Sequence, residues 1–422
     1  MTSKQRVVVI GGGLAGLRLA ARLTGGAAVT VLGEEQHVPY NRVLLAEVLA
    51  GRYAPEVAAL PEAGPVLRRG VRAVRVDRAD RTVHCDDGAA LAYDTLVLAT
   101  GSNPVLPPLR GLFEPEGRDL PDGVHAFRTM DDCLELSAAV RPGVRAVVIG
   151  GGLLGVSAAR ALAARGAQVV LSQQAARLME RQLDAEASAL LHAHLEALGV
   201  EIHTECRVRG LSTAATAPLP GAQRRVTGVE LADGYRLEAD LVVLACGVRP
   251  RTGLAQAAGL DVRKGIVVDN RLRTSDPRIH AIGDCAEHAG QVYGLAGAAL
   301  EQADVLAAVL NGADASYTGT RALTRLTLTT AGGTGTGTGT SAGAGPFDLA
   351  CFGETTPRPG DDVVRFADAT RRTYRTVVLR DDRLVGGVLL GELSTVGAVA
   401  RTWEGDEAPL DLFHLLTDDG GH

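Results

Sequence analysis

Residues 6–23 read RVVVIGGGLAGLRLAARL, a short apolar run that leads through a glycine-rich turn into residues with helical periodicity. Gly11, Gly13 and Gly16 occupy the glycine positions of a G-x-G-x-x-G pattern. Glycines at this spacing permit a tight turn and let backbone N–H groups at the start of a helix approach a pyrophosphate. The stretch therefore predicts a strand, a turn and a helix that bind a dinucleotide.

The residues after this helix strengthen the prediction, because a glycine-rich turn alone is a weak signal. A second predicted strand, AAVTVL at 27–32, is followed by Gly33 and then by Glu34 and Glu35. An acid roughly 20 residues beyond the first glycine is placed to bond the hydroxyls of an adenosine ribose. Either glutamate fits this role, and the sequence leaves the choice between them open.

The same pattern returns at 145–174, which reads RAVVIGGGLLGVSAARALAARGAQVVLSQQ. Gly150, Gly152 and Gly155 repeat the glycine spacing, and Gln173 stands where the first site has its glutamates. Two dinucleotide sites in one chain usually hold a flavin and a nicotinamide, because electrons pass from one to the other.

In three further segments a predicted strand leads directly to a glycine. These are YDTLVLATGSNP at 93–104, LEADLVVLACGVRPRTGLA at 237–255 and RIHAIGDCAE at 278–287. The first two place Thr100, Gly101 and Gly247 at strand ends, where ligands of α/β sheets bind. In the third, Asp284 is a candidate for bonding a ribityl hydroxyl, and the alternative is an ordinary helix cap.

These five segments, in this order, resemble the two-dinucleotide flavoproteins of the pyridine nucleotide-disulfide oxidoreductase superfamily. That superfamily includes glutathione reductase, ferredoxin and rubredoxin reductases, and NADH oxidases. The resemblance spans about residues 5–312. It implies FAD at the first site, NAD(P)H at the second, and an α/β fold with two Rossmann-like (glutathione-reductase-like) domains and a small C-terminal α+β domain. The implied domains are an FAD-binding domain at 1–110 and 240–314, an NAD(P)-binding domain at 111–239 and a C-terminal domain at 315–422.

Residues 39–51, PYNRVLLAEVLAG, indicate which subgroup of this superfamily the chain resembles. Their apolar residues predict a short helix that ends at Gly51, and the helix contains no cysteine. Disulfide reductases of the superfamily carry redox cysteines at this place. The stretch instead resembles the flavoprotein module of the NAD(P)H-dependent nitrite reductase large subunit, as do RLMERQLD at 177–184 and VVLRDDRLVGGVLLGE at 377–392. The resemblance implies that Tyr40, Asn41 and Arg42 lie near the flavin.

Arg42 is, by the same resemblance, a candidate for binding the flavin phosphates. Related ferredoxin reductases carry a lysine in this helix, and this chain does not. Without a thiol beside the flavin, we expect the electrons to leave for an external acceptor. A nitrite or nitrate reductase partner, and so a role in nitrate assimilation, is the first expectation. A ferredoxin or rubredoxin partner, an NADH oxidase and a flavin-based redox-sensing module are the alternatives. No catalytic proton-transfer residue is assigned.

Composition limits the function further. The net charge of −6 argues against nucleic acid as the main partner. No apolar run approaches the roughly 18 residues that a membrane helix needs. The first predicted strand starts at Val7, and the six cysteines form no C-x-x-C pair. We therefore expect a cytoplasmic protein with reduced thiols and no metal site, and a homodimer is possible.

Two other features complete the prediction. Residues 331–345 form a Thr/Gly-rich, low-complexity insertion, which is typical of a loop or linker. Beyond it, alternating residues predict antiparallel strands that turn at Asp381 and Asp382. Six arginines favour a solvated strand face, with docking of an acidic electron carrier as the alternative: Arg68, Arg69, Arg72, Arg75, Arg78 and Arg81.

Overall fold

The computed structural model of the chain describes residues 4–23, 26–61, 66–114, 117, 119–215, 223–321, 323–328, 347–368, 370, 372–391, 393 and 395–405. The Thr/Gly-rich insertion predicted at 331–345 lies outside these residues. Contacts divide the chain into two compact units. Unit 1 comprises Met1–Leu45, Tyr53–Asn103 and Val248–Ala322, and unit 2 comprises Ala46–Arg52, Pro104–Gly247 and Leu323–His422.

The centre of unit 1 is a five-stranded parallel sheet in the order β19-β7-β1-β2-β3. Its strands are β1 (Gln5–Ile10), β2 (Ala27–Gly33), β3 (Val66–Arg69), β7 (Thr95–Leu98) and β19 (Ile279–Ala281). Val7, Val8, Val9 and Ile10 are all buried, as expected for a parallel strand covered on both faces. Because β19 pairs with β7, residues 279–281 complete a sheet that begins at residue 5.

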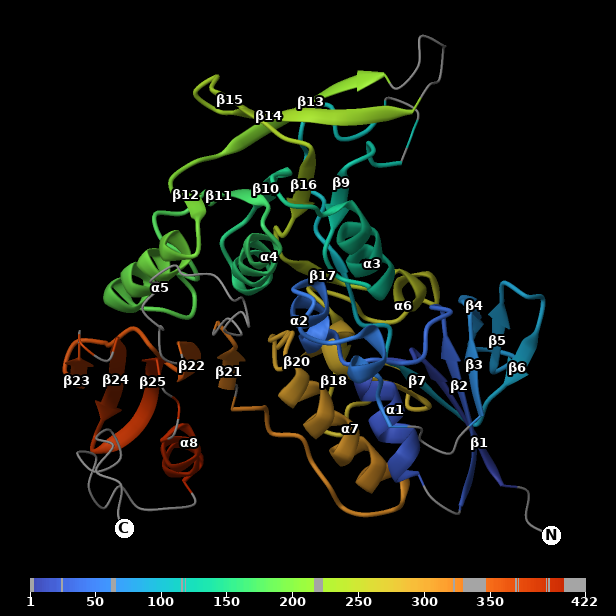
Figure 1. Cartoon of the computed structure of the whole chain (residues 1–422). Helices are drawn as coiled ribbons and strands as arrows, with labels where there is room; N and C mark the ends of the chain where they lie inside the picture. The colour runs from blue at the N-terminus through green and yellow to red at the C-terminus, as the bar shows by residue number, and fades with distance from the viewer. Residues whose placement is uncertain are drawn as a thin grey trace. The chain divides into compact units, whose positions relative to one another are not determined.

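Helices cover this sheet, and smaller strands surround it. Helix α1 (Leu14–Arg22) starts directly after the glycine turn and packs beside α7 (Ala296–Leu310) (Figure 1). The remaining elements are η1 (Arg42–Leu44), α2 (Leu45–Leu49), η2 (Pro55–Ala58), β4 (Ala73–Asp77), β5 (Thr82–Cys85), β6 (Ala90–Ala92), β8 (Ser102–Pro104), β17 (Val248–Pro250), α6 (Gly253–Ala257), β18 (Ile266–Val268), η3 (Gly283–Cys285) and β20 (Ala286–His288). Most of α2 belongs to unit 2, because that unit takes Ala46–Arg52.

Unit 2 contains a second five-stranded parallel sheet, in the order β12-β11-β10-β16-β9. Its strands are β9 (Val124–Ala126), β10 (Arg145–Ile149), β11 (Gln168–Ser172), β12 (Val200–His203) and β16 (Leu241–Leu244). The helices are α3 (Met130–Ala139), α4 (Leu153–Ala164) and α5 (Ala185–Ala197), and β13 (Val208–Ala215), β14 (Arg224–Leu231) and β15 (Arg236–Glu238) form an antiparallel sheet. The two parallel sheets confirm the predicted Rossmann-like α/β fold.

The described residues from 323 onward form a five-stranded antiparallel sheet and one helix within unit 2. The elements are β21 (Leu323–Leu326), β22 (Asp348–Gly353), β23 (Asp362–Asp368), β24 (Thr373–Arg380), β25 (Arg383–Gly391) and α8 (Val396–Glu404). The predicted turn is confirmed, because Asp381 and Asp382 join β24 to β25 with φ angles of +49° and +57°. The hydroxyl of Tyr374 donates to Asp184 at 2.8 Å and joins this sheet to the start of α5.

Candidate functional site

The glycine turn of unit 1 lies between β1 and α1, and two of its glycines are required by the packing of the protein itself. Gly11 has a φ of +127°, and a Cβ there would overlap the carbonyl oxygen of Ala99. A Cβ on Gly16 would overlap the carbonyl oxygen of Gly11. Neither position therefore has room for a side chain.

Gly13 differs from these two glycines. It has a φ of −85°, caps α1 without a side-chain hydrogen bond, and an added Cβ would meet no atom within 4 Å. Backbone strain and packing among the described residues therefore do not account for a glycine here. A pyrophosphate that approaches the first N–H groups of α1 does account for it, because the ligand needs the space that a side chain would fill. The turn fits the phosphates of FAD.

The turn of unit 2 repeats this arrangement between β10 and α4. Gly150 has a φ of +112°, and its Cβ would lie 2.5 Å from the carbonyl oxygen of Ala245. A Cβ on Gly155 would overlap the carbonyl oxygen of Gly150, whereas a Cβ on Gly152 would meet no atom within 4 Å. The second turn therefore fits a pyrophosphate by the same test.

Glu34 and Glu35 follow the carboxyl end of β2, and both are ion-paired. Glu34 accepts a hydrogen bond from Nη2 of Arg251 at 2.7 Å. Glu35 accepts from the hydroxyl of Tyr40 at 2.6 Å and from Nη2 of Arg42 at 2.5 Å. The structure thus groups the predicted acids with two of the residues expected beside the flavin, and Glu34 is the more exposed of the two acids.

Thr100, Gly101 and Asp284 come together although they lie far apart in the sequence. They follow the carboxyl ends of the neighbouring strands β7 and β19. The hydroxyl of Thr100 donates to the carbonyl oxygen of Arg251 at 2.7 Å, and that of Ser102 donates to Asp284 at 2.9 Å. Gly101 has a φ of +71° and open space around its Cα. This edge of the sheet is where ligands of α/β folds bind.

Gln173 and Gly247 lie at the carboxyl ends of β11 and β16 in unit 2. Oε1 of Gln173 accepts from the backbone N–H of Gly151 at 2.8 Å, and Nε2 donates to the carbonyl oxygen of Arg177 at 3.2 Å. The side chain at the expected ribose position is therefore bonded to the glycine turn itself. Gly247 has a φ of +95° and no atom within 4 Å of an added Cβ.

Replacing Gln173 with glutamate tests whether this side chain faces the nucleotide ribose. The carboxylate keeps an acceptor for Gly151 and adds a negative charge that repels a 2′-phosphate. We expect the ratio of kcat/KM for NADH to that for NADPH to rise about tenfold, which corresponds to about 1.4 kcal/mol. Gln174→Glu, an exposed neighbour, is the matched control. Equal ratios in the two variants would show that residue 173 does not line the ribose pocket.

Four of the six thiols are buried. Cys85, Cys133, Cys285 and Cys351 are buried, and burial raises the pKa of Cys133, Cys246 and Cys351 to about 11. A thiol with a raised pKa contributes little thiolate at neutral pH, so it is a poor nucleophile. Among the described residues, no three His, Cys, Asp or Glu side chains are grouped so that they could hold a metal ion. Within the same residues, no helix is long and apolar enough to cross a membrane.

A buried ion pair in unit 2 was not predicted from the sequence. Arg160 of α4 is 1% exposed and donates a hydrogen bond to Glu47 of α2. Nη1 of Arg52 lies 3.0 Å from the other carboxylate oxygen of Glu47. Desolvation by burial lowers the pKa of Arg160. The sequence feature that could have indicated this pair is Arg160 itself, the one charged residue in the otherwise apolar and small-residue helix LLGVSAARALAA at 153–164.

Two Rossmann-like sheets, each with a glycine turn that is open at its second glycine, define a protein that binds two dinucleotides. The profile of the family described as "Pyridine nucleotide-disulphide oxidoreductase" matches residues 5–303. The chain belongs to this family. It is an FAD-dependent NAD(P)H oxidoreductase, and this confirms the resemblance inferred from the sequence motifs.

Two curated relatives come from Bacillus subtilis (strain 168). Over 402 residues the chain is 35% identical to "Nitrite reductase [NAD(P)H]", covering 93% of this chain and 46% of that protein. Over 400 residues it is 32% identical to "Assimilatory nitrate reductase electron transfer subunit", covering 92% of this chain and 48% of that protein. The chain thus spans about half the length of these relatives.

The solved structures that resemble the chain include a putidaredoxin reductase and a ferredoxin reductase. The covalent putidaredoxin reductase–putidaredoxin complex aligns with a TM-score of 0.81 at 28% identity, covering 99% of this chain and 97% of that one. Ferredoxin reductase for the CYP199A2 system from Rhodopseudomonas palustris aligns with a TM-score of 0.80 at 26% identity, covering 97% and 99%.

Proposed function

We propose that the chain passes electrons from NAD(P)H through FAD to an external acceptor, and that this acceptor is a nitrite or nitrate reductase. The observation that carries the proposal is the pair of matching turns, each open at its second glycine, in a chain whose helix at 45–49 contains no cysteine. When bound, FAD and NAD(P)H supply hydride transfer and stepwise release of electrons. Each NAD(P)H yields two electrons and one proton, so one turnover reduces two molecules of a one-electron acceptor.

The residues of unit 1 are proposed to hold FAD. The N–H groups after Gly11 and Gly13 face the pyrophosphate, and Glu34 or Glu35 bonds the adenosine ribose. Asp284, which accepts a hydrogen bond from the hydroxyl of Ser102, is the proposed partner of a ribityl hydroxyl. Arg42 is ion-paired with Glu35, so a flavin phosphate must share its guanidinium with that carboxylate.

The residues of unit 2 are proposed to hold the nicotinamide nucleotide. Gly150, Gly152 and Gly155 shape its pyrophosphate site, and Gln173 and Gly247 follow the carboxyl ends of β11 and β16, the two strands on either side of β10. We therefore keep as a proposal the domain division expected from the sequence, with FAD-binding segments at 1–110 and 240–314 around an NAD(P)-binding segment at 111–239. The contacts also attach the described residues from 323 onward to the nicotinamide unit.

The first candidate acceptor rests on the two Bacillus subtilis relatives, whose names refer to nitrite reduction and to electron transfer for nitrate reductase. Both relatives are about twice as long as this chain, so a complete nitrite-reducing activity would need components outside the aligned region. A ferredoxin or rubredoxin is the second candidate, because ferredoxin-type reductases match almost the full chain in structure.

The direct test is NADH-dependent reduction of ferricyanide by the FAD-loaded protein, with nitrite alone as a second acceptor. We expect rapid ferricyanide reduction and no reduction of nitrite. A long-lived flavin–nicotinamide complex with negligible turnover would instead identify a redox sensor. Rapid NADH-dependent oxygen uptake would identify an oxidase.

Cysteine chemistry is expected to contribute nothing to this turnover. Cys206 and Cys246 are the two cysteines that are not buried. Replacing both with serine should change the rate of ferricyanide reduction less than roughly twofold, because no thiolate carries the electrons. Glutathione disulfide should be reduced only at background rate by the native protein. Loss of ferricyanide activity in the folded, FAD-replete double variant would contradict electron export without thiols.

A further inference from the structure

One segment of unit 2 joins the second glycine turn to the C-terminal antiparallel sheet. It is the 174–183 loop, which connects the end of β11 to the start of α5. Leu178, Met179 and Leu183 are at most 2% exposed, so the loop is packed into the unit. A series of hydrogen bonds begins at the turn, passes along this loop and the first turn of α5, and ends at β24.

The loop is bonded to Gly151, which lies between the first two glycines of the G-x-G-x-x-G pattern. Its N–H donates to Oε1 of Gln173 at 2.8 Å, and its carbonyl oxygen accepts from the N–H of Met179 at 2.9 Å. A Cβ on Gly151 would lie 2.6 Å from Cδ2 of Leu178. Gly151 is buried, whereas Gly152 next to it is exposed. The loop therefore fixes the backbone of the turn and leaves Gly152 open to a ligand.

The first turn of α5 holds the loop in place. Ser188 is 3% exposed, and its hydroxyl donates to the carbonyl oxygen of Leu178 at 2.9 Å. Asp184 is the N-cap of α5, and its Oδ1 accepts from the N–H of Ala187 at 2.8 Å. The N–H of Ser188 donates to the carbonyl oxygen of Asp184 at 3.1 Å. Because these two residues are bonded within one helical turn, movement of the N-cap also moves the hydroxyl that holds Leu178.

Tyr374 of β24 fixes this N-cap. It is 1% exposed, and its hydroxyl donates to Oδ2 of Asp184 at 2.8 Å. Burial, together with the hydrogen bond to Asp184, raises the pKa of Tyr374, so the hydroxyl is protonated at neutral pH. A hydrogen bond to a carboxylate is stronger than one between neutral groups. In the last turn of α5, the ring of His194 stacks on Phe347 with the centroids 4.2 Å apart. The segment from 323 onward is thus attached to both ends of α5.

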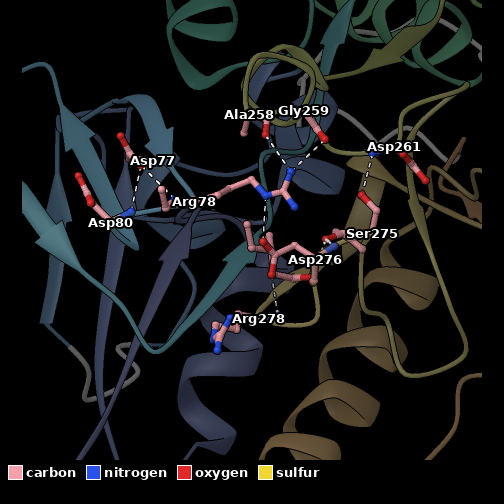
Figure 2. Close-up of polar contacts among 12 residues, drawn as sticks. Asp77, Arg78, Asp80, Ala258, Gly259, Asp261, Ser275, Asp276 and Arg278 are labelled. Atoms are coloured by element: carbon pink, nitrogen blue, oxygen red, sulfur yellow. Dashed lines mark hydrogen bonds and ion pairs between the residues drawn. The ribbon is translucent and has the colours of Figure 1, made fainter.

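A peripheral sheet of unit 1 is also attached by a polar side chain, but at a different place. Figure 2 shows Arg78, just after β4, reaching toward Asp276 and the two carbonyl oxygens that follow α6. Nε of Arg78 donates to Asp276 at 2.9 Å. Asp276 precedes β19, at the amino end of the parallel sheet, whereas the first glycine turn follows the carboxyl end of β1. Of these two attachments, only that of Tyr374 leads to a glycine turn.

We propose that Tyr374 is a positioning residue for the nicotinamide nucleotide, because it holds the second glycine turn through Asp184 and the 174–183 loop. The proposal rests on the proposed function, which assigns NAD(P)H to this turn. N–H groups that are already held in place bind a pyrophosphate at a lower cost in ordering entropy. Without the hydroxyl of Tyr374, the N-cap and the loop gain freedom that the nucleotide must remove when it binds. The C-terminal sheet therefore contributes to the affinity for NAD(P)H.

The test compares the native, FAD-loaded protein with Tyr374→Phe and Ser188→Ala, which break two different links of the series. Rapid mixing with NADH gives the Kd for NADH and the limiting rate of flavin reduction. Calorimetry gives the Kd for ADP-ribose, which carries the pyrophosphate but no nicotinamide. Each variant should raise both Kd values about fivefold and leave the limiting rate within roughly a factor of two. The double variant should exceed the larger single effect by less than about twofold, because both changes act on the same loop.

Arg78→Gln is the control, because it breaks the attachment of the peripheral sheet in unit 1, and it should leave both Kd values unchanged. Unchanged Kd values in a folded Tyr374→Phe protein with a lowered Tm would show that the hydroxyl only attaches the sheet, and would overturn the proposal. If Tyr374→Phe does not fold, unchanged Kd values in Ser188→Ala overturn it equally. Failure of the native protein to bind ADP-ribose would also overturn it. A native protein that binds ADP-ribose, but whose flavin NADH does not reduce, would refute the proposed function instead.

Discussion

Replacing Gly13 with valine is expected to yield a folded protein that has lost FAD. The backbone at Gly13 has a φ of −85°, which any residue adopts, and an added Cβ meets no protein atom within 4 Å. The fold therefore tolerates the side chain. The branched side chain would occupy the space through which a pyrophosphate reaches the N–H groups of α1. We expect FAD content to fall from about one per chain to less than roughly a tenth, with circular dichroism unchanged.

Two controls separate cofactor loss from damage to the fold. Gly26→Val lies before β2 and adds a Cβ to another position with no atom within 4 Å, so it should retain FAD. Gly152→Val makes the equivalent change in unit 2, and it should retain FAD while losing tight binding of NADH. Full flavin content in a folded Gly13→Val protein would show that the first turn does not hold the flavin.

The sequence was most informative where local chemistry determines the structure. The spacing of Gly11, Gly13 and Gly16 predicted the turn, and the space around each glycine now distinguishes their roles. The hairpin at Asp381 and Asp382 could also be predicted from the sequence, because short polar residues tolerate the positive φ angles that this turn needs. The contacts at Gly16 and in the hairpin lie within a few residues of the motif, whereas Gly11 meets Ala99 at the end of β7, which pairs with β1 in the sheet.

Contacts between distant segments were beyond sequence reasoning. The position of Gln173 was predicted, but not that its Oε1 accepts from the N–H of Gly151 while its Nε2 donates to the carbonyl oxygen of Arg177. The arginine-rich stretch was visible as a pattern, whereas the ion pair of Arg78 depends on Asp276, far along the chain. Glu47 and Arg160 are separated by 113 residues, and no local rule connects them.

The second large effect is expected at this buried pair. Glu47→Gln leaves the guanidinium of Arg160 charged and buried with a neutral partner. Nε and Nη1 of Arg160 have no hydrogen-bond partner among the described residues, so no other hydrogen bond there replaces the one to Glu47. Breaking a buried pair from one side costs about 3–5 kcal/mol. Because 1 kcal/mol shifts the Tm of a unit of this size by roughly 2–4 °C, we expect the thermal unfolding of unit 2 to occur about 10 °C lower.

Removing both charges should restore most of this loss, and that comparison identifies the cause. In Glu47→Leu/Arg160→Met, neither charge remains to be desolvated, and the new side chains fill similar volume, so Tm should return to within a few degrees of the native value. Glu186→Gln is the matched control, since it breaks an ion pair with Arg365 in the same unit whose side chains are 54% and 46% exposed. Such exposed pairs contribute at most about 1 kcal/mol. A double variant as unstable as Glu47→Gln would mean that packing of α2 against α4, and not an unpaired buried charge, determines the stability.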